Sequence, residues 1–298
     1  MKTQRKVLVA VLVFFTLLAA LAGWYLHRYP VSVVQPAGVI GHKERNLIIF
    51  TASISLVVVI PVFAMLIGFA LRYREGNPRG RYSPDLAGSR VAETIWWLIP
   101  AIMIGMIGTI TWRSSYALDP FRPLSGGKTE QVQVVALDWK WLFIYPDQHM
   151  ASVNVAYIPA NTPVDFQITS DAVMTSFWAP QLGGQMYAMP GMSTHLNLEA
   201  NRMGMFNGSA ANISGKGFAD MTFRVVVLSS NQYAKQMQSL GTASSTGPLT
   251  ASAYSNLAQP SVLHGNRFYR SVEPDLYDRI VLKYMTPVSA ASNLGASL

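Results

Sequence analysis

The sequence predicts a membrane-anchored all-β protein, in which two transmembrane helices precede a β-sandwich domain and a C-terminal helical arm. Residues 47–71 and 94–112 contain no charged side chain, and each stretch approaches or exceeds the roughly 20 apolar residues that span a bilayer. After residue 130 the apolar pattern changes from a helical period to alternation, which is typical of half-buried strands. Within residues 229–298, two segments, 230–240 and 272–284, have helical patterns.

The N-terminal residues 1–22 have the pattern of an export signal. Three basic side chains (Lys2, Arg5 and Lys6) precede the apolar run 7–22, and Ala20-Leu21-Ala22 offers a small-residue cleavage site. Two outcomes stay open from the sequence: cleavage after about Ala22, or retention of the segment as an additional anchor.

The two membrane helices are expected at residues 46–71 and 91–112. Pro61 is expected to kink the first helix rather than end it, and Pro100 lies near the start of the second. A buried helical hairpin of a soluble protein fits such long uncharged stretches poorly. In the connecting loop, residues 72–90, arginines outnumber acidic side chains, so the positive-inside rule predicts a cytoplasmic loop. Residues 23–45 and everything beyond residue 113 then face the periplasm.

The exported part begins with a linker rich in Pro, Gly and Ser at residues 113–130. Alternating stretches such as 131–134, 164–169 and 222–228, separated by turn residues, predict a β-sandwich at residues 131–228. In the arm, residues 229–298, we expect a serine-capped helix at 230–240 and a second helix at 272–284. The Gly/Ser/Thr-rich stretch 241–255 between them is expected to be mobile.

Composition excludes several functional classes. The chain is 50% hydrophobic and 13% charged, which is typical of a membrane protein, and its net charge of +8 forms no basic stripe that would suit nucleic acid. The absence of cysteine excludes disulfides, thiolate metal sites and a lipoprotein anchor. No catalytic constellation stands out, because the five histidines are scattered without ligand spacing. They are His27, His42, His149, His195 and His264, and His195 lies in an alternating strand that suggests a hydrogen-bonded surface or core residue.

One segment has the spacing of a metal-binding motif without its ligands. The binuclear copper motif C-x-E-x-C-x-x-x-H-x-x-M of cytochrome c oxidase subunit II is matched in spacing by Ala210, Asn212, Ser214, Phe218 and Met221. Only Met221 keeps the ligand type. The upstream H-S-[FW] histidine is replaced by Thr175. Since this copper site needs thiolates and imidazoles, the sequence predicts a domain without copper.

This pattern of ligand loss resembles subunit II of the bo-type ubiquinol oxidases. Three further segments carry the resemblance, namely residues 138–146, 159–164 and 185–192, and it extends from about residue 36 to the C-terminus. The resemblance implies a cupredoxin-like Greek-key sandwich in the periplasm, anchored in the bacterial inner membrane. It also implies a proton-translocating complex that oxidises ubiquinol and reduces oxygen to water. Hemes, copper and the quinol would belong to the partner subunit I, with subunits III and IV also present and no role for cytochrome c.

The resemblance also assigns expectations to single residues. Trp139 and Trp141 match an aromatic segment through which electrons enter the copper-bearing relatives, and without copper we expect both to be structural. Trp24 replaces the acylated cysteine found in many quinol oxidase relatives, so no lipid modification is expected. Glu93 matches a glutamate regarded as a proton entrance. A carboxylate in the first turn of a helix is also favoured by the helix dipole, with Ser89 as a possible cap, so both roles stay open.

Two alternative functions share part of this pattern. A membrane-anchored cupredoxin-like binding or assembly protein, working apart from an oxidase, would share the fold and both membrane helices. Glu93 and the small residues Gly105 and Gly108 favour close packing in a larger membrane complex. The second alternative, a copper-bearing cytochrome c oxidase subunit, is disfavoured by the ligand losses.

Overall fold

A computed structural model describes residues 31–74, 88–124, 127–242 and 247–285, together with residues 13, 16–17, 20–21, 23–25 and 28–29. The chain divides into two compact units. The helical unit consists of residues 1–31 and 45–118, and the sandwich unit consists of residues 32–44 and 119–298. Most of the expected export signal, and residues 75–87 of the expected cytoplasmic loop, lie outside the described residues.

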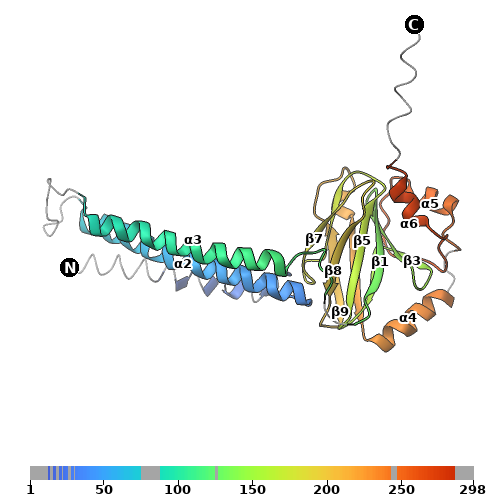
Figure 1. The fold of residues 1–298 in the computed structure, drawn as a ribbon, viewed down its shortest axis with the longest axis horizontal. Coiled ribbons are helices and arrows are strands. Elements are labelled where there is room, and N and C mark those ends of the chain that lie inside the picture. The colour runs from blue at the N-terminus through green and yellow to red at the C-terminus, as the bar shows by residue number, and fades with distance from the viewer. Residues whose placement is uncertain are drawn as a thin grey trace, which may run out of the picture. The chain divides into compact units, whose positions relative to one another are not determined.

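The helical unit contains most of α2 (Val39–Arg72) and all of α3 (Arg90–Ala117) (Figure 1). Both helices are long and apolar enough to cross a membrane, and both continue through their internal prolines, as expected for Pro61. No residue of α3 is buried, and α2 buries only Ile40 and Gly41, near its N-terminal end. Both helices therefore require apolar surroundings that the described chain does not supply, and the protein is membrane-anchored.

Both helices are longer than the sequence predicted. α2 begins at Val39 rather than residue 46, because its first turn is part of the sandwich unit. There the Gly41 amide donates to the carbonyl of Leu182 at 3.0 Å, and Gly38 forms a β-bridge with Ala200. α3 continues to Ala117 rather than residue 112, because no glycine or proline interrupts the chain before Pro120.

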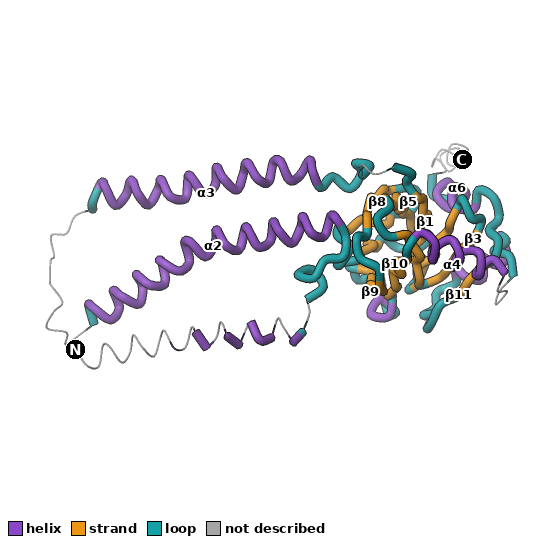
Figure 2. Tube along the Cα trace, turned by 90° about the horizontal axis from the view of Figure 1, so that it is seen from below, coloured by secondary structure: helices purple, strands orange, loops and turns teal. Residues whose placement is uncertain are grey.

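The strands of the sandwich, orange in Figure 2, form two mixed sheets. The first sheet contains, in spatial order, β11 (Arg267–Tyr269), β3 (Met150–Val153), β2 (Lys140–Tyr145), β1 (Glu130–Leu137), β5 (Pro163–Ser170) and β8 (Thr194–Glu199). The second contains β4 (Val155–Pro159), β10 (Thr222–Leu228), β9 (Gly204–Ala210), β6 (Thr175–Trp178) and β7 (Gln185–Ala188). This architecture confirms the predicted cupredoxin-like sandwich.

The strand order brings one set of loops to the same end of both sheets. β1 and β5 are parallel, so Ala136 pairs with Ser170 and both strands finish together, while β2 starts at that end opposite Leu137. In the second sheet β6 begins near the end of β9, because Phe177 pairs with Ala210. We call this the site end, and define it by the turn 138–140 and the loops 171–174, 189–193 and 211–221.

The space between the sheets is filled by aromatic side chains. Trp141, Phe143, Phe166 and Phe177 are fully buried, and Phe177 stacks on Phe223 with ring centroids 4.6 Å apart. Trp141 meets the edges of Phe177 and Phe223 at centroid distances of 5.4 and 5.6 Å. Such pairs add to the stabilisation from burial, so this cluster is the central core of the sandwich.

The C-terminal arm is helical, as predicted, but two details differ from the sequence interpretation. Its helices are α4 (Ser230–Thr242), α5 (Ala251–Ala258) and α6 (Leu276–Leu282), on the side of the sandwich where β3 lies (Figure 1). The expectation of a mobile stretch at 241–255 is wrong for its C-terminal part, where Leu249 is fully buried and α5 is capped by Thr250. The predicted helix 272–284 is shorter, because Val272 bridges to Leu249 and Asp275 has a left-handed backbone with φ 58°.

Candidate functional site at one end of the sandwich

The residues in the former ligand positions lie on two segments that meet at the site end. The loop from Ala210 to Met221 leaves β9, forms the short 3-10 helix η1 (Phe218–Asp220) and enters β10. It closes on itself through the Ala210 amide, which donates to the Met221 carbonyl at 3.0 Å. The Ala211 amide donates to the Ser176 carbonyl at 3.2 Å, so this loop is fixed beside the start of β6.

Two ordinary polar contacts join side chains at this site. Ser176 donates to the Asn212 side-chain oxygen at 2.8 Å, and the Ser214 hydroxyl lies 3.9 Å from the Met221 sulfur. Thr175, Ala210 and Met221 are buried, while Asn212, Ser214 and Phe218 are half-buried. The hydroxyl of Thr175 is buried without a hydrogen-bond partner among the described residues. The structure therefore gathers the six predicted positions at one end of the sandwich.

This donor set does not fit a binuclear copper centre. It offers hydroxyls, one amide oxygen and the Met221 thioether, whereas such a centre requires bridging thiolates and imidazole nitrogens. Across the ranges that the structure describes, three or more His, Asp or Glu side chains nowhere form a group that could hold a metal ion. His195 is engaged elsewhere, with its Nδ1 3.0 Å from both carboxylate oxygens of Asp165.

Trp139 packs directly on the loop that carries the former ligand positions. It occupies the turn between β1 and β2 with a left-handed backbone (φ 64°), and its indole N–H donates to the Ser214 carbonyl at 3.0 Å. The ring lies so close to Gly217 that a side chain there would overlap it, and a Cβ atom added at Gly215 would lie 3.4 Å from it. Trp141, two residues later, belongs to the core and is fully buried.

Glu93 lies in the helical unit, in the first turn of α3. Ser89 caps this helix, as the sequence suggested, because its hydroxyl accepts from the Ala92 amide at 3.4 Å. The Glu93 side chain is exposed, and its carboxylate folds back over the backbone of Gly88. This position suits a helix-start residue, because a carboxylate in the first turn is favoured by the helix dipole.

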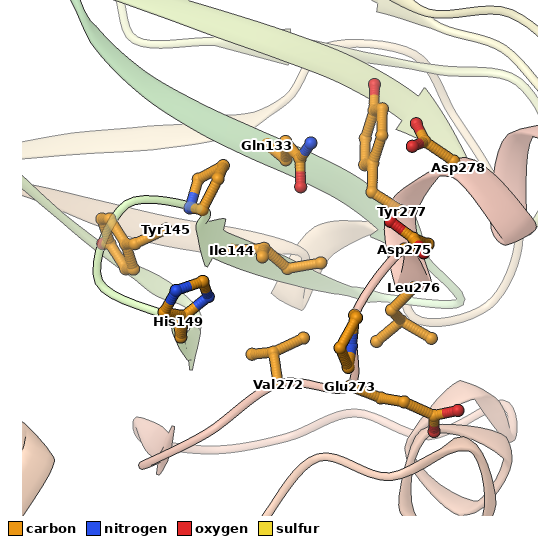
Figure 3. A pocket seen from close by; sticks show the side chains of 12 residues that line it. Gln133, Ile144, Tyr145, His149, Val272, Glu273, Asp275, Leu276, Tyr277 and Asp278 are labelled. Carbon is orange, nitrogen blue, oxygen red and sulfur yellow. The ribbon is translucent and has the colours of Figure 1, made fainter.

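A pocket of about 250 Å³ lies between the arm and the first sheet (Figure 3). Ile144 from β2 and Gln133 from β1 face residues 272–278 of the arm across it. Its rim is acidic, but Glu273 is already paired with Arg279 at 2.9 Å and accepts from the Ala251 amide. We assign no ligand to this pocket, since its carboxylates have partners or face solvent.

Sequence reasoning missed two buried charged residues at the site end, Lys140 and Asp171. Lys140 could have been noticed as a charge inside the otherwise apolar strand 140–145. Asp171 gave no local signal, because its partners lie between 83 and 113 residues further along the chain.

Comparison with known families agrees with this fold. Residues 145–229 match the family described as the periplasmic domain of cytochrome c oxidase subunit II, and residues 243–288 match the one described as the COX aromatic rich motif. Together with the two apolar helices, these matches define the class: a membrane-anchored subunit II of an oxidase complex.

Curated relatives identify the family within that class. The chain is 44% identical over 254 residues to the cytochrome bo(3) ubiquinol oxidase subunit 2 of Pseudomonas aeruginosa, across 85% of this chain and 76% of that protein. It is 40% identical over 256 residues to the ubiquinol oxidase subunit 2 of Acetobacter aceti, across 85% and 82%. The chain belongs to the ubiquinol oxidase subunit 2 family.

Among solved structures, the periplasmic domain of cytochrome oxidase subunit II of Bradyrhizobium japonicum aligns with 22% identity and a TM-score of 0.37, covering 40% of this chain and 96% of that one.

Proposed function

We propose that this chain is a non-catalytic subunit of a proton-translocating complex that oxidises ubiquinol and reduces oxygen to water. The names of the relatives support this proposal. In this complex, subunit I carries the hemes, the copper and the quinol, and subunits III and IV complete the assembly. The sandwich then contributes docking surface and stability rather than electron transfer.

The observation that carries this proposal is a closed loop that has the spacing of the copper motif but an unsuitable donor set. Met221 and the Ala210–Ser214 segment lie beside the start of β6, yet only a thioether is present among the copper-type ligands. Residues 210–221 contain no histidine or cysteine that could take over. The periplasmic domain therefore binds no copper and accepts no electrons from cytochrome c.

Elemental analysis of the purified subunit tests this directly. Stoichiometric copper together with near-infrared absorption would contradict the proposal. The constructive version replaces Thr175, Ala210, Asn212, Ser214 and Phe218 with His, Cys, Glu, Cys and His. A purple copper centre should then form, because the loop already has the required spacing and closure. A variant that carries only the two cysteines is the matched control, and it should not develop the same spectrum.

Membership of a complex is tested by co-purification. An affinity tag at the C-terminus should recover a heme-bearing subunit I, with the heme absorption spectrum as the readout. Recovery of the chain without heme, from membranes that contain active oxidase, would favour the alternative of a separate binding or assembly protein. The small residues Gly105 and Gly108 on α3 suit close packing against a partner helix, because they let helix backbones approach each other. The described chain leaves both positions uncovered, with nothing within 4 Å of a Cβ atom added at either one.

The topology that accompanies this function has the sandwich and arm in the periplasm and residues 72–90 in the cytoplasm. The arginines of that loop support this orientation through the positive-inside rule. The protein is then a multi-pass protein of the bacterial inner membrane, exported by its N-terminal signal. Glu93 lies on the cytoplasmic side in this arrangement, where it serves as a proton entrance to subunit I.

A further inference from the structure

The arm contacts three of the four chain segments that make up the site end. Residues 247–285 reach the turn 138–140, the loop 171–174 and the loop 189–193 through hydrogen bonds of their side chains or carbonyl groups. The fourth segment, loop 211–221, is reached through Trp139 of the turn 138–140. These contacts join groups that are far apart in the chain, so they exist only when the arm is docked.

Asp171 is the first attachment point. Its side chain is 2% exposed and accepts three hydrogen bonds from the arm: from the Tyr254 hydroxyl at 2.6 Å, the Lys283 ammonium at 2.7 Å and the Tyr284 hydroxyl at 2.7 Å. Its amide donates to the Ala136 carbonyl at 2.9 Å, which fixes it to the end of β1. Burial and, to a smaller extent, the bond to Asp171 raise the pKa of Tyr254. Hydrogen bonds to a charged acceptor are stronger than neutral ones.

Lys140 is the second attachment point, with the opposite charge. It is 1% exposed, and its ammonium donates to the Gln259 carbonyl at 2.8 Å, the Ser261 carbonyl at 3.1 Å and the Ser261 hydroxyl at 2.8 Å. An ammonium has three N–H donors, and the arm offers an acceptor for each. Burial lowers the pKa of Lys140, as does nearby Arg267, while Asp138 opposes the change. Lys140 follows Trp139, whose indole N–H donates to the Ser214 carbonyl. The arm is therefore connected through Lys140 and Trp139 to the loop 211–221.

The third attachment is neutral. The Tyr277 hydroxyl lies 2.8 Å from the Ser193 hydroxyl in the loop 189–193. In the same loop Gly191 has φ 73°, and a Cβ atom there would lie 3.2 Å from the Cβ of Tyr284. The tyrosines of the arm thus combine an apolar body, which packs on the sandwich, with a hydroxyl that reaches a loop.

From these contacts we propose that the C-terminal arm is a brace that holds the loops of the site end in place. In this role the arm supplies cross-links between loops, as a bound metal ion does in a copper-containing centre. A metal ion tied to several loops contributes its binding free energy to folding. Here the side chains at Thr175 and 210–221 cannot form such bonds, and the arm joins the surrounding loops from outside. Asp171 and Lys140 are the positioning residues of this brace.

The experiment compares hydrogen–deuterium exchange of the full-length subunit, purified in detergent, between wild type and the variants Asp171→Asn and Lys140→Met. Two regions are followed: the arm peptide 276–283 and the loop peptide 211–221. Both variants keep the size of the side chain and remove its charge. Asp147→Asn is the matched control, because Asp147 forms an exposed ion pair with Lys128.

The brace predicts that exchange becomes about tenfold faster in both peptides for each variant, the factor that corresponds to the loss of one hydrogen bond to a charged group. The Asp147→Asn control should leave both peptides unchanged. Faster exchange of the arm alone, with the loop 211–221 unaffected, would show that the arm is merely attached and would overturn the proposal. Unchanged exchange in both peptides would overturn the attachment itself.

A milder variant covers the case in which the charge-removing variants fail to accumulate. Tyr254→Phe removes one hydroxyl from Asp171 and leaves its two other donors in place. It should raise exchange about tenfold in both peptides, because it removes one hydrogen bond to a charged acceptor while Asp171 keeps its charge. If the loop 211–221 of Tyr254→Phe exchanges at the wild-type rate while the arm exchanges faster, the result counts against the brace. This measurement needs no quinol turnover, so its outcome is independent of the proposed oxidase function.

Discussion

Replacement of Trp141 by alanine should destabilise the sandwich strongly, because this residue is the largest fully buried side chain of the core. Its ring meets the edges of Phe177 and Phe223, and its indole N–H is buried without a partner in the described part of the chain. Truncation therefore removes packing and no side-chain hydrogen bond.

The expected cost follows from that geometry. Removal of a buried aromatic ring costs about 3–5 kcal/mol in unfolding free energy, of which each aromatic pair accounts for about 0.5–1.5 kcal/mol. Trp141→Phe should cost less, about 1–2 kcal/mol, because it restores most of the ring and also removes an unpaired buried donor. The cost of Trp139→Ala should fall between those of the two Trp141 variants. The Trp139 ring is only half-buried, but its removal also removes the hydrogen bond to the Ser214 carbonyl.

Urea unfolding of the purified full-length subunit, followed by circular dichroism, measures these differences, and heme content of the assembled complex reports on assembly. We expect the order Trp141→Ala, Trp139→Ala, Trp141→Phe, from most to least destabilised. A Trp141→Ala or Trp139→Ala variant that assembles and unfolds normally but fails to oxidise quinol would refute the structural role. An electron or quinol role for the aromatic segment would then have to be considered.

Three other predictions concern distant parts of the chain. Glu93→Ala should slow turnover and proton uptake while heme spectra and assembly stay normal, with partial recovery in Glu93→Asp; unchanged turnover would leave Glu93 as a helix-start residue worth about 0.3–1 kcal/mol. Mass spectrometry of the mature N-terminus should find either a start near residue 23 or the intact signal. Neither form should carry a diacyl group, because Trp24 has no thiol, and a diacyl mass would contradict this prediction. Burial raises the pKa of Tyr277 to about 12, above its ordinary value near 10, so its contribution to stability is present below pH 10 and is lost as pH rises towards 12. The unfolding free energy should therefore fall above about pH 10, less steeply in Tyr277→Phe, and an identical slope in that variant would count against the assignment.

Local patterns were sufficient to predict the secondary structure of much of the chain. The uncharged stretches predicted α2 and α3, and alternation predicted the strands that became β1, β5 and β10, the last with its bounds at residues 222–228. Where prediction failed, a contact from elsewhere in the chain decided the outcome. The first turn of α2 is fixed by the carbonyl of Leu182, and the start of α6 is delayed by the bridge between Val272 and Leu249.

The sequence by itself determined the loss of the metal ligands, because a metal site depends on residue type and spacing, and both can be read along the chain. It also determined the two membrane-length helices, because bilayer insertion depends on a continuous apolar stretch. Only the tertiary structure decided how the arm is used. Asp171 receives Tyr254, Lys283 and Tyr284 from 83 to 113 residues away, and Lys140 receives carbonyl groups from 119 and 121 residues away. Such contacts arise from the way the arm packs on the sheet, and no local period in the sequence records them.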